Sequence, residues 1–387
     1  MQHQKCNLNK LLNMNKLYNP FLLLGYAGHE YFCGRDTERK ELISALRNGR
    51  NITLMSPRRM GKTGLIKDTF YQIGKENKNA VCLYMDIFAT KSLGDFVSLL
   101  GKTVIGKLDS IPQKTASAIA NIFKSCRVVF STDIASGLPQ ASLDFKEQDT
   151  QNTLGEIFSY IKESDKECII AIDEFQQISE YPETETEALL RSYIQFCPNL
   201  HFIFSGSKQH LMDDIFSSAA RPFYRSTEKM NLKPIPMETY FKFSCKWMKT
   251  TGITLDKNTF EKIYNMVEGH TWYVQYILNK LFELAPEKVT ESDINECVMK
   301  IVETETDGYK RIYDFLTINQ AQLLVAIAKE HIVPAINSNS FIRKYNLKGT
   351  SSINKAVAQL INKELVFHTE KGYSVYDRFM EIWLKRI

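Results

Sequence analysis

The sequence S-P-R-R-M-G-K-T occupies residues 56–63, between an apolar run, Ile52–Met55, and a segment with the apolar spacing of a helix, Leu65–Ile73. A strand, a tight loop and a helix in this order are the context of a phosphate-binding loop. In such a loop, successive backbone N–H groups surround phosphate oxygens, and the positive end of the following helix adds to the attraction. We therefore expect a nucleotide-binding loop that consists of Pro57, Arg58, Arg59, Met60, Gly61, Lys62, Thr63 and Gly64.

Two side chains of this loop have expected roles of their own. The Lys62 ammonium should reach the β- and γ-phosphates of ATP as a point charge, and the Thr63 hydroxyl should bind Mg²⁺. The usual pattern, G-x-x-x-x-G-K-[ST], has glycine where this chain has Ser56, which is also small. A G-K-T tripeptide occurs by chance as well, so the interpretation depends on a second element.

That second element is C-I-I-A-I-D-E-F-Q, residues 168–176. Its apolar run predicts a strand that is buried on both faces, as in a parallel sheet. Asp173 and Glu174 follow at the carboxyl end of this strand, where ligands of open α/β sheets bind. We expect Asp173 to hold Mg²⁺ through water and Glu174 to orient or deprotonate the attacking water. Taken alone, the segment would fit a strand followed by a solvated acidic turn. Its position after the phosphate loop, within one α/β pattern, favours the catalytic interpretation.

Strands and helices alternate around these two motifs, which predicts an α/β core with a parallel sheet. Further strands are expected over 80–87 and 200–204. Residues 110–148 interrupt the alternation with an expected helix over 111–124 and an expected β-hairpin over 127–145. The hairpin fits either a partner-contact element or a decoration of the surface.

Length and composition indicate a globular protein of two or three domains, since the chain has 387 residues and 24% of them are charged. No apolar run approaches the ~18 residues of a membrane span, so we expect no membrane partner. The eight cysteines are widely spaced and form no C-x-x-C pair, which fits buried thiols in a reducing cytoplasm. Residues 1–19 are expected to be disordered, and translation starts at either Met1 or Met14.

The net charge of +5 is unevenly distributed. Residues 317–387 contain ten Lys or Arg and five Asp or Glu, so they account for the whole excess. A basic module of this kind suits an acidic partner such as duplex DNA, although many helical domains carry as much charge for solubility.

Small and basic residues after the 200–204 strand are further candidates. Ser205 and Ser207 can contact the γ-phosphate or the attacking water, or form a simple turn. Arg225 can stabilise the charge that develops in phosphoryl transfer. A structural ion pair is the alternative for this arginine and for Arg221.

The motifs together resemble the AAA+/STAND superfamily, and most closely its archaeal-type ATPases. The resemblance rests on Gly34-Arg35-Asp36, the 57–66 loop, I-I-A-I-D-E-F-Q (169–176), F-I-F-S-G-S (202–207) and P-F-Y-R (222–225), in this order. It implies a P-loop ATPase core over 20–232, an all-helical lid over 233–308 and a winged helix over 309–387.

The resemblance also implies two further nucleotide contacts. The turn with Arg35 is similar to the entry segment of the family, which lies close to the base. The segment E-G-H-T-W-Y, residues 268–273, is similar to the lid motif that senses the nucleotide, and it places His270 at the site. Thr271 stands where the family has proline, so this part of the motif departs from the pattern.

Residues 317–387 have the layout of a winged helix, with helices expected over 319–329, 338–345 and 351–363 and a two-stranded wing over 364–376. In DNA-binding winged helices the third helix enters the major groove. Residues 338–376 are therefore a candidate surface for duplex DNA, while protein binding is the other use of such modules. The oligomeric state stays open.

The combined reading is an ATP-binding, Mg²⁺-dependent switch with low basal turnover, whose nucleotide state controls the winged helix. Lys62, Glu174 and Arg225 are the expected catalytic residues, and Thr63 and Asp173 the expected metal ligands. Two alternatives are a nucleotide-controlled DNA-binding protein and a protein-interaction scaffold that binds ATP without turnover.

Overall fold

The computed structural model describes residues 17–108, 122–132, 139–164 and 166–387. These residues form two compact units, one of residues 24–240 with 270–272, and one of residues 17–23, 241–269 and 273–387. The helix expected over 111–124 lies almost entirely outside the described residues.

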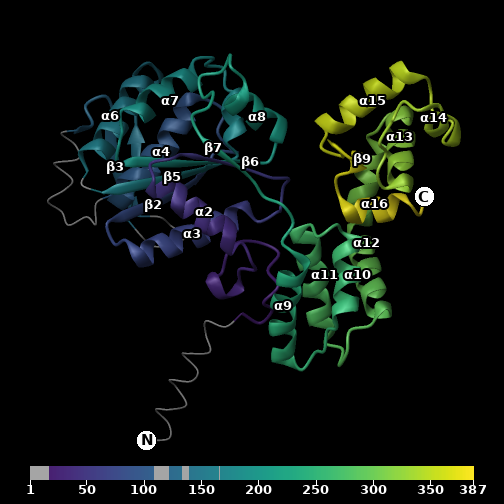
Figure 1. The fold of residues 1–387 in the computed structure, drawn as a ribbon. Helices are drawn as coiled ribbons and strands as arrows, with labels where there is room; N and C mark the ends of the chain where they lie inside the picture. The colour runs from purple at the N-terminus through teal and green to yellow at the C-terminus, as the bar shows by residue number, and fades with distance from the viewer. Residues whose placement is uncertain (1–16, 109–121, 133–138, 165) are drawn as a thin grey trace, which may run out of the picture. The chain divides into compact units, whose positions relative to one another are not determined.

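A five-stranded sheet organises the first unit, in the order β2–β5–β6–β1–β7, with every neighbouring pair parallel (Figure 1). The predicted α/β core is thereby confirmed. Its elements are η1 (His29–Tyr31), α2 (Asp36–Arg47), β1 (Ile52–Met55), α3 (Lys62–Glu76), β2 (Ala80–Asp86), α4 (Leu93–Leu108), β3 (Arg127–Thr132), β4 (Pro139–Asp144), η2 (Glu147–Asp149), α6 (Thr150–Glu163), β5 (Glu167–Asp173), η3 (Phe175–Glu180), α7 (Thr186–Gln195), β6 (Leu200–Gly206), α8 (Gln209–Ser217) and β7 (Glu228–Asn231).

Both faces of the sheet are covered, because its central strands are apolar on both sides. One hydrophobic core lies between the sheet and α2 and α3, and the other between the sheet and α4, α6, α7 and α8. Figure 1 shows these groups of helices on opposite faces. Strand β5 is buried from Cys168 to Asp173, so Asp173 reaches the carboxyl edge of the sheet with an apolar strand behind it.

An antiparallel hairpin of β3 and β4 is present where the sequence predicts one, with Arg127 paired to Asp144 and Thr132 to Pro139. It packs on α4, where Leu143 lies so close to Gly101 that a Cβ atom there would come within 2.3 Å of the leucine side chain. The hairpin is therefore attached to the core by its base.

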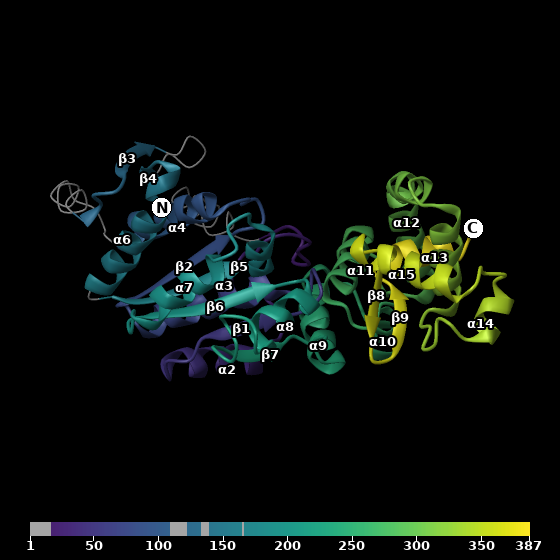
Figure 2. The same cartoon turned by 90° about the horizontal axis from the view of Figure 1, so that it is seen from above.

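The second unit begins with helices and ends in a winged-helix layout. Its elements are α9 (Met237–Met248), which starts in the first unit, η4 (Lys249–Thr251), α10 (Lys257–Met266), α11 (Thr271–Leu284), α12 (Glu291–Asp314), α13 (Ile318–Glu330), α14 (Asn339–Lys344), α15 (Thr350–Asn362), β8 (Val366–Thr369), β9 (Gly372–Val375) and α16 (Arg378–Leu384). Strands β8 and β9 pair as the wing beside α13 and α15 (Figure 2).

Two predicted boundaries differ from the structure. The boundary between residues 308 and 309 falls inside α12, which continues without a break to Asp314. At the other end, the described residues before Leu24 belong to the second unit. Phe21 is completely buried against Phe243 and Phe282, and Asn19, expected to be disordered, donates a hydrogen bond to the Asn279 carbonyl (3.0 Å).

Candidate ATP site

The loop between β1 and α3 has the backbone of an anion-binding site. Arg59 and Gly61 adopt left-handed conformations, with φ angles of 63° and 97°. Alternation of right- and left-handed residues turns neighbouring N–H groups toward a common point. Gly64 lies in the first turn of α3, where a Cβ atom would approach the Phe32 ring to 2.7 Å. The glycine thus lets the helix start against the entry segment.

Lys62 is buried inside this loop, with 6% of its surface exposed. Its ammonium donates to the carbonyl oxygens of Ser56 (3.0 Å) and Pro57 (3.3 Å). Burial lowers the pKa of Lys62, while the Asp173 and Glu174 carboxylates oppose this shift. The charge is therefore held at the centre of the loop by main-chain acceptors that a phosphate can replace.

Asp173 accepts hydrogen bonds from two neighbouring strands, from helix α3 and from the main chain of the next residue. Oδ2 accepts hydrogen bonds from the hydroxyls of Thr63 (2.8 Å) and Tyr84 (2.7 Å). Oδ1 accepts from the Ser205 hydroxyl (2.7 Å) and the Glu174 N–H (3.1 Å). Thr63 and Asp173, the two residues expected at the metal, thus contact each other, and Ser205 joins them from β6.

Glu174 is held beside Asp173 in an unusual backbone conformation. Its φ angle of 55° lies in the left-handed region, which is uncommon for a residue with a side chain. Its carboxylate accepts hydrogen bonds from the Ser207 hydroxyl (2.8 Å) and from the Gln176 amide. Gly206 lies between the two serines, and a Cβ atom there would come within 2.4 Å of the Gln176 amide oxygen. Close packing thus fixes the base candidate against β6.

Arg35 touches the loop from the outside. Its buried guanidinium donates to the carbonyl oxygens of Lys233 (2.6 Å) and Met60 (3.1 Å) and to the Glu38 carboxylate (2.7 Å). These bonds hold the loop against the entry segment. The structure thus gives Arg35 protein acceptors, and its expected contact with nucleotide remains a prediction.

Residues 270–272 lie against the same loop. His270 Nε2 donates to the Arg58 carbonyl (3.1 Å), and the Thr271 hydroxyl donates to the Met60 carbonyl (3.3 Å). The Arg59 guanidinium lies 4.2 Å from the centre of the Trp272 ring, within cation–π range. Thr271, which replaces the family's proline, therefore supplies a hydrogen bond that proline cannot.

The structure brings together all the predicted site residues except Arg225. That side chain is exposed and lies over the Tyr224 ring (5.2 Å). In the described part of the chain, no hydrogen bond or ion pair links it to Lys62, Asp173 or Glu174. Arg221 forms ion pairs with Glu187 and Asp214, which is the structural alternative that the sequence left open.

Three residues of the site were missed in the sequence: Tyr84, Asp86 and Gln176. Tyr84 and Asp86 belong to β2, and Asp86 is the register partner of Asp173. Burial raises the pKa of Asp86, and the charges of Asp173 and Glu174 raise it further. The signal available was a carboxylate at the end of a second apolar strand, the same pattern that identified Asp173.

The donor set suits Mg²⁺. Thr63 gives its proton to Asp173, so the lone pairs of its hydroxyl oxygen remain for a cation. Mg²⁺ is commonly bound by one or two protein oxygens together with phosphates and water. No group of three or more His, Cys, Asp or Glu side chains arranged to hold a metal occurs within the described residues.

Residues 32–277 match the ATPase domains found predominantly in Archaea, and residues 307–386 match a probable winged helix domain. The chain belongs to this ATPase family. The Walker-type ATPase PABY2304 of Pyrococcus abyssi has a similar structure, with a TM-score of 0.64 and 17% identity, over 95% of this chain and 100% of that one. The ORC2 protein of Aeropyrum pernix gives a TM-score of 0.55 and 13% identity, over 91% and 92% of the two chains. No curated protein is significantly similar in sequence.

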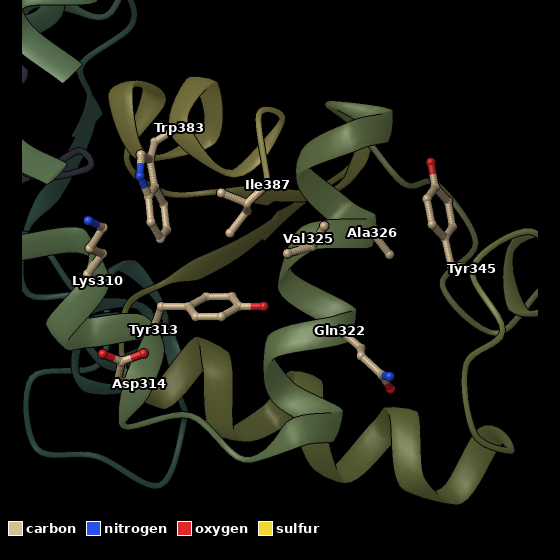
Figure 3. A pocket seen from close by; sticks show the side chains of 9 residues that line it. All are labelled: Lys310, Tyr313, Asp314, Gln322, Val325, Ala326, Tyr345, Trp383 and Ile387. Atoms are coloured by element: carbon tan, nitrogen blue, oxygen red, sulfur yellow. The ribbon is translucent and has the colours of Figure 1, made fainter. Parts of the chain in front are cut away.

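The winged-helix part of the ATPase has a cavity of about 590 Å³ between α12, α13 and α16. Figure 3 shows the Tyr313 ring pointing toward Val325 of α13, with Trp383 and Ile387 on the α16 side. Aromatic and aliphatic side chains form most of its wall, together with Lys310, Asp314 and Gln322. This chemistry suits an apolar group better than a nucleotide.

No helix in the described part of the ATPase combines the length and the apolar character required to cross a membrane.

Proposed function

We propose that this ATPase is an Mg²⁺-dependent molecular switch with low basal turnover, in which the nucleotide state controls the winged helix. The core supplies the phosphate loop, the Thr63–Asp173 pair and the Glu174 carboxylate. The further claim of a switch is supported by a single turn of the chain, residues 268–272.

The chemistry follows from the atoms around the loop. Lys62 would exchange its carbonyl acceptors for the β- and γ-phosphates, and Thr63 with Asp173 would hold Mg²⁺, which neutralises charge on the phosphates. Glu174 would accept a proton from the attacking water. Its Oε2 already accepts from Ser207 and Gln176, which orients the carboxylate, and Oε1 would take the proton from water.

The second half of the 268–272 turn contacts the phosphate loop. His270 and Thr271 bind the carbonyls of Arg58 and Met60, which are residues of the loop itself. Phosphate binding that reshapes the loop would alter these two bonds. The turn would then have different contacts in the two nucleotide states, which a switch requires.

The other half of the turn contacts the winged helix. Glu268 forms ion pairs with Arg378 of α16 and with His331 at the end of α13 (3.2 Å to its Nε2). Arg378 and His331 also bind Glu381, at 2.8 Å and 2.7 Å. Within one short turn, His270 and Thr271 thus bind the phosphate loop, and Glu268 binds two winged-helix elements. This observation carries the proposal.

ATP turnover by the purified chain in Mg²⁺ tests the enzymatic part. We expect turnover that Glu174→Gln lowers by about 10²-fold or more while ATP binding is retained, and a Lys62→Ala variant that loses binding as well. Phosphate release and binding of a fluorescent ATP analogue measure the two effects. Turnover that Glu174→Gln leaves unchanged would contradict the role of this residue, and ATP binding without turnover in the wild type would favour the scaffold alternative.

Arg225 has the weakest support among the expected catalytic residues, because its guanidinium lies over Tyr224 in this state. We retain it as a candidate that acts after rearrangement or on a neighbouring subunit. Arg225→Ala in the same assay examines this role, with Arg191→Ala as a control, since Arg191 binds the Pro222 carbonyl close by in the chain.

Binding of duplex DNA is the second candidate function. The observation in its favour is that Lys355 and Lys363 are exposed on and directly after α15. Three polar side chains of α15 form hydrogen bonds within the protein, which argues against contacts with DNA bases: Ser352 with Asn319, Asn354 with Asn337, and Gln359 with Gln320. Phosphate contacts therefore have more support than base contacts.

This second function predicts DNA binding without sequence preference. Affinity should fall steeply with salt, because lysine–phosphate contacts release counterions. Replacing Lys355 and Lys363 by alanine should lower the affinity, whereas Lys300→Ala on α12 should not. Fluorescence anisotropy with a labelled duplex measures both, and an unchanged affinity in the double variant would exclude this surface.

A further inference from the structure

Asp173 has no free acceptor position in this structure. An ionised carboxylate offers about four lone-pair positions for hydrogen bonds. Thr63 and Tyr84 occupy Oδ2, and Ser205 and the Glu174 N–H occupy Oδ1, all at 2.7 to 3.1 Å. The carboxylate is therefore saturated by protein donors.

Saturation conflicts with the expected role of Asp173. Mg²⁺ gives up its water shell reluctantly, so it is usually held by protein carboxylates together with several waters. For Asp173 to accept a hydrogen bond from this shell, one of its four donors has to leave.

The four donors differ in how readily they can leave. Thr63 has to stay, because its donation to Asp173 keeps its lone pairs available for the ion. The Glu174 N–H is part of the main chain, and Ser205 is completely buried. Tyr84 is partly exposed, and it is the one donor whose hydroxyl can turn toward solvent without moving the main chain.

Tyr84 is also unlike the others in being dispensable for the expected ion site. It lies on β2, 89 residues before Asp173 in the chain, and reaches the carboxylate across the β2–β5 pair. A tyrosine hydroxyl has an ordinary pKa of about 10, so it stays protonated and remains a donor at physiological pH.

We propose that the Tyr84 hydroxyl is a placeholder on Asp173, which occupies the acceptor position needed by the water shell of Mg²⁺ and withdraws when the ion binds with ATP. The inference rests on the proposed ATPase function and adds a residue that sets the affinity of the site for the ion. In the ion-free state the placeholder keeps the carboxylate satisfied, because a partly buried carboxylate without donors is costly.

Tyr84→Phe removes the hydroxyl and keeps the ring. The probe is Mn²⁺, and free Mn²⁺ is measured by its electron paramagnetic resonance signal in the presence of the full chain and the analogue adenylyl imidodiphosphate. We expect Tyr84→Phe to bind Mn²⁺ about five-fold more tightly, since ~1 kcal/mol of hydrogen bond no longer has to be broken. Binding of the analogue in EDTA should be unchanged.

One variant serves as the control. Tyr26→Phe removes another tyrosine–aspartate hydrogen bond of 2.7 Å in the same unit, to Asp68, and should leave Mn²⁺ affinity unchanged. Thermal unfolding of each variant verifies that it is folded.

The outcomes separate the two proposals. Unchanged or weaker Mn²⁺ binding in Tyr84→Phe overturns the placeholder and leaves the ATPase function intact. Tighter Mn²⁺ binding in Tyr26→Phe as well overturns the special role of Tyr84. A wild-type chain that binds the analogue but no Mn²⁺ overturns both the placeholder and the Mg²⁺-dependent function.

Discussion

Glu381 is a carboxylate with only 3% of its surface exposed, held by Lys385, Arg378 and His331 of the winged-helix part. Its oxygens accept hydrogen bonds from Lys385 (2.6 Å), His331 (2.7 Å) and Arg378 (2.8 Å). Burial alone would raise the pKa of Glu381, but these hydrogen bonds together hold the pKa below its ordinary value of 4.5. The ionised form is thus preferred in the folded state.

The lowered pKa predicts how stability depends on pH at this residue. The contribution of Glu381 is fully present above pH 4.5 and is lost as the pH falls through the lower folded-state value. We expect Glu381→Gln to lower the free energy of unfolding by roughly 2–4 kcal/mol at pH 7, because cations lose a buried partner. The difference in stability between variant and wild type should narrow below pH 4.5. Thermal unfolding from pH 7 to 3.5 measures this difference, with Glu296→Gln at an exposed pair as control. A gap that stays constant with pH would contradict the assignment.

Among the helices, α12 contains a residue, Gly308, whose substitution has a clearly predictable effect on stability. It runs for 24 residues and begins with a capping box, in which Thr290 and Asp293 bind each other's main-chain N–H groups. Gly308 lies inside this helix, and a Cβ atom there would have no neighbour within 4 Å. Glycine in a helix is destabilising relative to alanine, because it loses more backbone freedom on folding.

Gly308→Ala should therefore stabilise α12 and the unit that contains it, by about 0.5–1 kcal/mol. The measurement is the midpoint of thermal unfolding. Gly372→Ala is the contrasting variant, since its φ angle is 126° and a Cβ atom would come within 2.3 Å of the Val333 carbonyl oxygen. A stabilised Gly372→Ala or a destabilised Gly308→Ala would contradict this account of the two glycines.

For the whole molecule, the 268–272 turn predicts that ATP binding and winged-helix dynamics are coupled. In the wild type, we expect hydrogen–deuterium exchange in α13 and α16 to differ between ADP and a non-hydrolysable ATP analogue. Glu268→Gln weakens the ion pairs with Arg378 and His331, so the difference should shrink while nucleotide affinity changes by less than about three-fold. Glu283→Gln, in an exposed pair with Lys280, should behave as wild type. An undiminished difference in Glu268→Gln would remove this turn from the coupling route.

The core of the fold could be predicted from the sequence wherever a local pattern had a single physical interpretation. The apolar run before Gly61-Lys62-Thr63 and the buried strand before Asp173 both predicted parallel strands, and their carboxyl ends meet at the site. Strand β7 was not predicted, because Glu228–Asn231 is a polar edge strand with little burial. Its position beside β1 depends on hydrogen bonds with a distant part of the chain.

The site was predictable in its phosphate loop, its acidic pair and the two serines at the end of β6, but not in Tyr84 and Gln176. Tyr84 resembles any other aromatic residue of an apolar strand, and its bond to Asp173 arises only when β2 and β5 pair. Gln176 binds Glu174 only two residues away, through the local turn that follows β5. Arg35 was expected at the nucleotide through a family resemblance, yet its bonds to Met60 and Lys233 arise from tertiary packing.

The order of strands in the sheet has a consequence for biosynthesis. Strand β1, which precedes the phosphate loop, is flanked by β6 and β7. Residues 52–55 therefore cannot complete their strand pairing until residues 228–231 have been synthesised. On the ribosome, the loop has neither neighbour while the first half of the core emerges, and non-local parallel pairing of this kind forms slowly. We therefore expect the strand before the phosphate loop to be paired on both sides only after about residue 231 has left the exit tunnel, before the helical unit emerges.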